Sequence, residues 1–259
     1  MVRKCVLGFL AIAAVAPLHA RSQTILNTER FQLGDVDGFH ASVDLAASLQ
    51  RGNKRVFDVS TSGMVGFVSG RHWPRVIFGG KYLSDDSRSI LDQQFFQLRY
   101  SFIFSPDTQS FHFVQAQKNE TLLLRSRWLV GSGVRRAFVN SPTTQVAVGT
   151  GAMIEWEELE PGRIGSGDQA STRALRMANM AVLSYAFDGG ARILNILYVQ
   201  PEFSDLGDLR LLNDLGLIVP LSSRLRSTIS LEWRRDSRPP STLEHDDLTL
   251  KAGFALEVN

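Results

Sequence analysis

The final stretch of the chain alternates strictly between apolar and polar positions. The first set comprises Leu248, Leu250, Ala252, Phe254, Leu256 and Val258, and the second comprises Thr249, Lys251, Gly253, Ala255, Glu257 and Asn259. Successive side chains of a β-strand point to opposite faces, so this pattern predicts a strand with one apolar and one polar face.

The same pattern recurs back to about residue 38 and predicts about twelve strands. Strand three is expected over about 73–83, strand six over about 122–138, and strand eight, the least regular, over about 172–187. The apolar parity includes Leu122 and Leu124 in strand six, and Leu194, Ile196 and Tyr198 in strand nine.

The connections between these strands alternate in length. Short turns are expected at 70–72, 105–108, 140–143, 188–190 and 220–224, and longer polar loops at 84–93, 158–171, 201–207 and 237–247. The tight turn at 51–54 is the exception on the long-loop side. An even strand number with short turns at one end and long loops at the other is typical of outer-membrane barrels.

Aromatic residues on the apolar parity gather near the predicted strand ends. Those near the long-loop end are Phe57, Tyr82, Trp156, Tyr198 and Trp233, and those near the other end are Phe39, Phe67, Trp73, Phe102, Phe104, Phe187 and Phe254. Such girdles mark the level where rings lie between hydrocarbon and water. Because hydrocarbon leaves an open strand edge unsatisfied, the first and last strands must pair. We therefore predict an all-β protein, a closed antiparallel up-and-down transmembrane β-barrel.

The first residues predict a secretory signal peptide. Arg3 and Lys4 precede an apolar run, and Ala20 offers a small residue at the cleavage site. A membrane anchor is the alternative, although the run is short for a helix of about 20 residues. The expected organisation is a signal peptide at 1–20, a periplasmic lead-in at 21–37 and the barrel at 38–259.

Composition narrows the chemistry further. The one cysteine, Cys5, lies in the predicted signal peptide, which leaves the mature chain without disulfides or cysteine metal sites. The net charge of +2 gives no reason to expect nucleic acid as a partner. No cofactor or metal is expected. The acidic pairs Asp85–Asp86 and Glu157–Glu158 could hold calcium, but they are more simply interpreted as solvated loop charge.

The polar parity should line an enclosed lumen. The candidates are Asp44, Asp58, Lys81, Arg99, Arg125, Arg127, Arg135, Glu155, Glu157, Asp214, Arg226, Glu232, Arg234, Lys251 and Glu257. Because both signs occur, a lattice of ion pairs is favoured over a selective pore lined by arginine. Periodicity alone does not say which face is wet, so a soluble barrel with an apolar interior remains the alternative.

The chain resembles the family of salt-induced outer-membrane proteins that are YdiY-like and carry domain of unknown function 481. The resemblance rests on Arg51-Gly52-Asn53 in the first hairpin, on Leu129-Val130-Gly131-Ser132-Gly133 with Arg125 and Arg127 before it, and on the closing strand. Two positions depart from the family pattern: Lys54 stands where threonine is common, and Val258-Asn259 ends a chain that commonly ends in an aromatic. The resemblance implies an outer-membrane location and no established activity.

These features together predict a bacterial outer-membrane β-barrel with a structural or narrow-channel role and no enzymatic activity. Its expected partners are outer-membrane lipid, lipopolysaccharide and the barrel-assembly machinery. One alternative is a lipid-modifying enzyme centred on His40, which shares a strand face with Ser42 and Asp44. The other is a soluble periplasmic barrel that binds an apolar ligand.

Overall fold

A computed structural model of the chain describes residues 37–50, 56–85 and 89–258. The predicted signal peptide and nearly all of the predicted lead-in lie outside these residues and stay predictions. Among the residues that the structure describes, no helix has the length and apolar character needed to cross a membrane.

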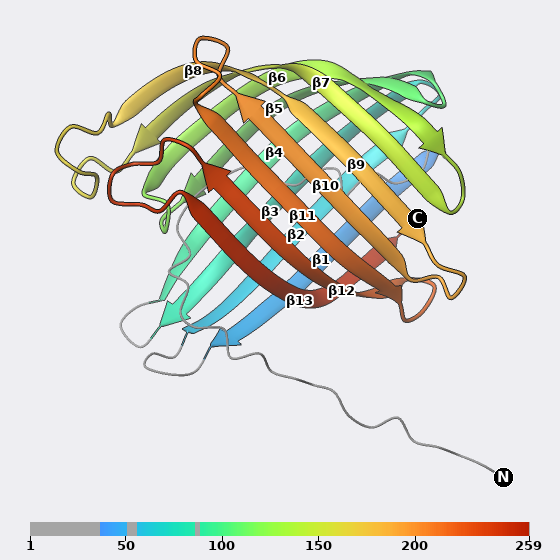
Figure 1. Cartoon of the computed structure of the whole chain (residues 1–259). Helices are drawn as coiled ribbons and strands as arrows, with labels where there is room; N and C mark the ends of the chain where they lie inside the picture. The colour runs from blue at the N-terminus through green and yellow to red at the C-terminus, as the bar shows by residue number, and fades with distance from the viewer. Residues whose placement is uncertain (1–36, 51–55, 86–88, 259) are drawn as a thin grey trace.

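The described chain is a series of antiparallel strands joined by turns and loops (Figure 1). The strands are β1 (Gly38–Gln50), β2 (Val56–Val68), β3 (His72–Asp85), β4 (Ser89–Ser105), β5 (Thr108–Asn119), β6 (Leu124–Asn140), β7 (Thr144–Leu159), β8 (Ser171–Met177), β9 (Asn179–Ala186), β10 (Arg192–Pro201), β11 (Leu209–Pro220), β12 (Leu225–Asp236) and β13 (Asp246–Val258). Both β8 and β9 pair with β7, and they act as one strand interrupted at Ala178.

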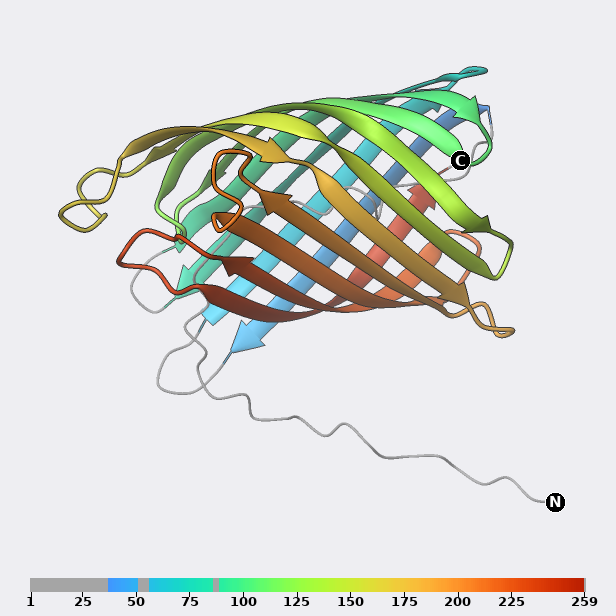
Figure 2. The same cartoon turned by 45° about the horizontal axis from the view of Figure 1, so that its top comes forward.

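The sheet closes on itself. β13 pairs with β1, with Phe254 opposite Leu45, and β6 pairs with β7 to complete the ring. Counting β8 and β9 as one, the barrel has twelve strands, which confirms the predicted closed antiparallel barrel. Figure 2 shows the wall from β9 to β13 in front of the wall from β1 to β6.

The two faces of the strands have the polarity that a bilayer requires. Phe254 and Leu256 on β13 are 55% and 48% exposed, whereas Glu232 and Arg234 on β12 are 7% and 9% exposed. Large apolar side chains thus cover the exterior, and the charged side chains of these strands face the interior. This is the arrangement of a barrel in lipid, and it excludes the soluble barrel with an apolar interior.

The barrel has two different rims, both visible in Figure 1. At the first, which we call the turn rim, the connections are short: 69–71, 106–107, 141–143, 187–191 and 221–224. At the second, the loop rim, longer connections occur at 160–170, 202–208 and 237–245. The predicted loop at 84–93 is mostly strand, because Tyr82 and Leu83 continue the ladder with Leu91 and Ile90.

The face assignments of strands six and nine contained errors. β6 has a register shift between Leu124 and Ser126, so the alternation inverts there: Leu124 is buried and Arg125 is exposed. In β10, Ile196 and Tyr198 are buried and Ile193 is exposed, the reverse of the prediction. Both strand faces there are largely apolar, so alternation could not distinguish them.

The predicted aromatic girdle is partly correct. Tyr82, Trp156 and Trp233 near the loop rim are exposed, and so are Phe39, Phe67, Phe104, Phe187 and Phe254 near the turn rim. The predicted position at the lipid-facing rim is wrong for Trp73 and Tyr198, because both are buried inside the barrel. Phe57 lies where no side chain is described.

Two glycines let β6 and β7 approach closely. Gly133 and Gly151 lie directly opposite one another. A Cβ at Gly133 would press on the Thr150 carbonyl oxygen and the Gly151 Cα, and one at Gly151 would press on the Ser132 carbonyl oxygen. The close contact of these two backbones depends on the missing side chains.

Candidate functional site

The loop-rim half of the lumen holds a buried network of ion pairs centred on Arg210 of β11. Its Nη1 lies 2.5 Å from Glu155 Oε2, its Nη2 lies 3.2 Å from Glu157 Oε2, and its Nε lies 3.1 Å from Asp236 Oδ2. Arg127 of β6 also pairs with Glu157, and its Nε lies 3.5 Å from Glu155 Oε2. These charge-assisted bonds connect four strands, β6, β7, β11 and β12.

Arg176 extends this network to the loop rim. Its Nε lies 3.3 Å from Glu155 Oε1, and its Nη1 donates to Asp208 Oδ1 at 2.9 Å and to the Gln200 carbonyl oxygen at 3.4 Å. Three arginines therefore face four carboxylates. Because the charges nearly balance and bond one another, the network braces the barrel and does not form a ring of one sign.

Next to this network an apolar cluster occupies the part of the lumen enclosed by β5, β6, β7, β9, β10 and β11. It consists of Phe111, Ala137, Ala147, Met180, Val182, Ile196, Tyr198 and Leu212, and we call it the apolar plug. Phe111 comes from β5 and Leu212 from β11, which lie on different walls. A cavity of about 50 Å³ lies beside the plug, between Gln97, Arg127 and Gln200.

The part of the lumen enclosed by β1 to β4, β12 and β13 contains a vestibule towards the loop rim. It is a cavity of about 100 Å³ lined in part by Asp44, Lys81, Glu232, Arg234 and Lys251. Glu232 Oε1 accepts a hydrogen bond from Lys251 Nζ at 3.0 Å and forms an ion pair with Arg234 Nη2 at 2.7 Å. The vestibule is thus polar and of mixed charge.

Trp73 lies on the lumen face of β3 in this part of the barrel, near the turn rim. Its side chain is 0% exposed, and the Arg75 guanidinium carbon lies 3.6 Å from its ring centroid, a cation–π contact. Arg75 Nη2 donates to Ser101 Oγ at 2.7 Å. Gly66 on β2 leaves room for both side chains, since a Cβ there would meet Arg75 Cγ at 2.7 Å.

The candidates for the lumen differ in burial. Those that are buried are Arg99, Arg127, Arg135, Glu155, Glu157, Asp214, Glu232 and Arg234, and those that are half-buried are Asp44, Asp58, Lys81, Arg226 and Lys251. Arg125 is the exception, because the register shift in β6 leaves it exposed. Trp73 and the members of the apolar plug were missed, since an inward apolar residue gives no charge signal.

His40, Ser42 and Asp44 share the lumen face of β1, as the sequence predicted. His40 and Ser42 are buried there, with Asp44 half-buried beyond them. The structure also joins His112 to Ser132, whose Oγ lies 2.8 Å from His112 Nδ1. These two residues are far apart in sequence and meet because β5 pairs with β6.

Glu157 and Glu158 point to opposite faces of β7. Glu157 is buried in the ion network, whereas Glu158 is exposed on the other face of β7, and the described residues include no group of three or more His, Cys, Asp or Glu that could hold a metal ion. Asp86 lies outside the described residues.

A closed antiparallel barrel with an apolar exterior and a braced, polar interior defines a transmembrane β-barrel of the outer-membrane type. The chain belongs to the family described as protein of unknown function, DUF481, whose model matches residues 43–257. This confirms the resemblance drawn from the sequence. No curated protein matches the chain.

Two solved structures share the fold. A NanC porin is 6% identical with a TM-score of 0.54, and the match covers 84% of this chain and 100% of the porin. The COG4313 outer membrane channel from Pseudomonas putida F1 is 9% identical with a TM-score of 0.52, covering 86% and 96% of the two chains. At such low identity the likeness concerns the fold alone.

Proposed function

We propose that the protein is an outer-membrane barrel with a narrow channel that is closed at the turn rim. The observation that carries this proposal is the position of Trp73, fully buried in the lumen between the polar vestibule and the turn rim. Arg75 and Ser101 hold the ring in place. Solutes that enter the vestibule therefore meet a closed end in this conformation.

The size and charge of the vestibule limit what it passes. A cavity of about 100 Å³ holds only a few water molecules, since each occupies about 30 Å³ in the liquid. Lys251 and Arg234 stand beside Glu232, so neither sign of ion is strongly preferred. Water and small ions are the solutes that fit once Trp73 moves aside.

Conductance of the purified protein in planar bilayers tests this function. We expect small, rare openings for the wild type and a clear increase for Trp73→Ala. Trp128→Ala is the matched control, because Trp128 is 52% exposed on the exterior, and its conductance should equal that of the wild type. If Trp73→Ala conducts no better than the control, the channel is ruled out and the structural role is left.

The proposed partners of the barrel are the lipids around it and the machinery that inserts it. The apolar exterior suits contact with outer-membrane lipid and lipopolysaccharide, and insertion would require the barrel-assembly machinery. We propose no catalytic role, because His40 is held inside the barrel. Replacement of His40 by alanine should leave the lipid profile of the host membrane unchanged, and an altered profile would favour an enzyme.

A further inference from the structure

A linked set of polar side chains lies on the exterior of the barrel, on β3 to β6. His72 Nδ1 and the Tyr100 hydroxyl oxygen are 2.7 Å apart, and the Tyr100 and His112 rings stack at 5.9 Å between centroids. His112 Nδ1 lies 2.8 Å from Ser132 Oγ. We call these four residues the outer polar cluster.

The exterior position follows from strand parity. Tyr100 shares its face of β4 with Leu98, and Ser132 shares its face of β6 with Val130, and both apolar residues are exposed. Polar groups facing hydrocarbon are costly unless they are bonded, so most outer-membrane barrels avoid them there. Four linked polar side chains on this face therefore indicate a role that a purely apolar wall would not fulfil.

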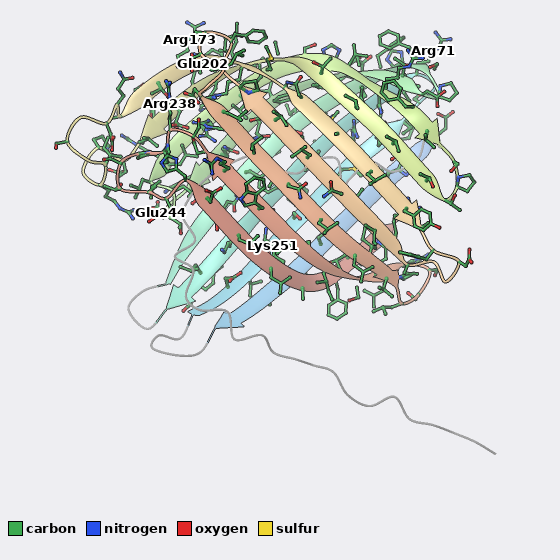
Figure 3. The ribbon with its side chains drawn as sticks, viewed as in Figure 1. Arg71, Arg173, Glu202, Arg238, Glu244 and Lys251 are labelled. Atoms are coloured by element: carbon green, nitrogen blue, oxygen red, sulfur yellow. The ribbon has the colours of Figure 1, made fainter. Side chains whose placement is uncertain are left out.

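The cluster begins at the turn rim, where lipid headgroups lie, and runs into the wall as far as Ser132, about halfway along β6. His72 is the first residue of β3, and Arg71 precedes it in the turn, at the rim seen in Figure 3. Arg136 lies on the same exposed face of β6 as Ser132, nearer the turn rim, and its guanidinium carbon is 5.9 Å from the Phe138 ring centroid. Two guanidinium groups on either side of two histidines favour a bound phosphate.

An apolar groove continues from the cluster across the wall. Its volume is about 930 Å³, within the range of small-molecule sites of about 300–1,000 Å³. Its floor is a row of directly paired residues on successive strands: Val65, Val76, Leu98, Val114, Val130 and Ile154. Tyr100, His112 and Ser132 also line it. A hydrocarbon chain lying across the strands matches this surface.

We propose that this wall binds one diacyl phospholipid from the leaflet at the turn rim. Its phosphate lies between Arg71 and Arg136 beside His72 and His112, and its acyl chains occupy the groove. The site faces the bilayer and not the lumen, so it does not depend on whether the barrel conducts.

Native mass spectrometry of the full chain, titrated in detergent with phosphatidylethanolamine, tests the site. We expect one tightly bound lipid for each barrel. Diacylglycerol with the same chains lacks the phosphate and should bind about tenfold more weakly, the loss expected for one hydrogen bond to a charged group. Equal binding of diacylglycerol would overturn the headgroup site.

Variants separate the site from unspecific contact with lipid. Arg71→Gln combined with Arg136→Gln should weaken the binding of phosphatidylethanolamine about tenfold, and His112→Phe, which keeps an aromatic ring but removes both ring nitrogens, should do the same. Arg173→Gln is the matched control, because Arg173 is exposed on β8 near the loop rim. If all variants bind alike, the proposal is wrong.

Inorganic phosphate is the third probe. Because the acyl chains supply much of the binding, we expect phosphate alone at millimolar concentration not to displace the lipid. Displacement at that concentration would mean that the acyl chains contribute little to binding, and a free anion would then replace the phospholipid as the ligand of this site. The gel shift between folded and unfolded barrel confirms that each variant is folded before titration.

Discussion

Arg210 Nη1 and Glu155 Oε2 lie 2.5 Å apart, although their strands, β11 and β7, are separated in the sheet by β9 and β10. The bond crosses the region where the wall is weakest. β10 pairs with β9, but it reaches β8 only where Glu202, just beyond its end, forms a bridge with Arg176. The ion network therefore holds together a part of the wall in which the backbone ladder is short.

The first prediction concerns this bond. Arg210→Met removes the cation that pairs with Glu155, Glu157 and Asp236. It leaves two arginines facing four carboxylates. Breaking a buried pair from one side costs about 3–5 kcal/mol because the remaining charge is uncompensated. We expect unfolding at a clearly lower temperature, measured as the temperature at which the folded gel band disappears.

A second variant shows whether charge is the cause. Glu157→Gln added to Arg210→Met leaves two arginines facing three carboxylates, which is the same excess of one negative charge as in the wild type. It should recover part of the lost stability. If the double variant is less stable than Arg210→Met, the packing of the arginine and not its charge matters.

The second prediction concerns the glycine pair. Gly151→Ala places a methyl group against the Ser132 carbonyl and the Gly133 backbone, so β6 and β7 must separate. Overpacking of this kind costs about 1–3 kcal/mol. Gly216→Ala is the control, because the nearest atoms to its Cβ would be 3.8 Å away, and it should be neutral or slightly stabilising. The temperature at which the folded gel band disappears should be lower for Gly151→Ala than for Gly216→Ala.

Most of the fold could be predicted from the sequence because one physical rule acts on nearly every strand. Most side chains next to lipid are apolar, and the neighbours of each along the strand point into the lumen. The alternation of β13 alone therefore predicts a strand of a membrane barrel. Arg125 was misplaced because a register shift is a property of paired backbones. No pattern within one strand reveals it.

The interior of the barrel was harder to predict for a different reason. Ile196 and Trp73 are apolar and were expected to face lipid, but a small barrel must also fill its lumen. Their inward position depends on which strands face each other across the lumen. Likewise, His112 and Ser132 meet only through strand pairing, and sequence spacing gives no sign of it.

The third prediction tests the inward position of Ile196. Ile196→Ala leaves a cavity inside the apolar plug and should cost about 2–5 kcal/mol. Leu215→Ala removes a similar side chain from the exterior, where it is 43% exposed and lipid chains can fill the space. We expect a smaller loss for Leu215→Ala in the same thermal assay. Equal losses would mean that the plug is loosely packed.

The fourth prediction tests which face meets hydrocarbon. Val130 is exposed on the exterior about halfway along β6, and an arginine there should cost about 2–4 kcal/mol. Thr228→Arg introduces the same side chain beside the polar vestibule and should be tolerated better. The measurement is the fraction of folded barrel recovered in lipid vesicles. Better recovery of Val130→Arg than of Thr228→Arg would reverse the face assignment.

The last prediction concerns the loops at the loop rim, where Asp168 joins two of them. Asp168 Oδ2 accepts hydrogen bonds from the Ser241 hydroxyl at 2.9 Å, the Ser241 amide at 3.0 Å and the Gly165 amide at 2.9 Å. These bonds, the Ser241 hydroxyl foremost, hold the pKa of the Asp168 carboxyl below its ordinary value of 3.8. Because the folded pKa is lowered, the link between the loops is complete above about pH 3.8 and is lost as the pH falls through the lower, folded value.

Hydrogen exchange of the Gly165 and Ser241 amides, corrected for their intrinsic rates at each pH, follows this link. Protection should stay constant from pH 7 to about pH 4 and decline only at lower pH. In Asp168→Asn it should be weaker at every pH and should no longer change with acid. The Gly190 amide is the internal control, because it donates to the Phe187 carbonyl at the turn rim and involves no carboxylate. If protection at Gly190 falls in parallel with that at Ser241, acid is loosening the whole barrel and the loop link is not the cause.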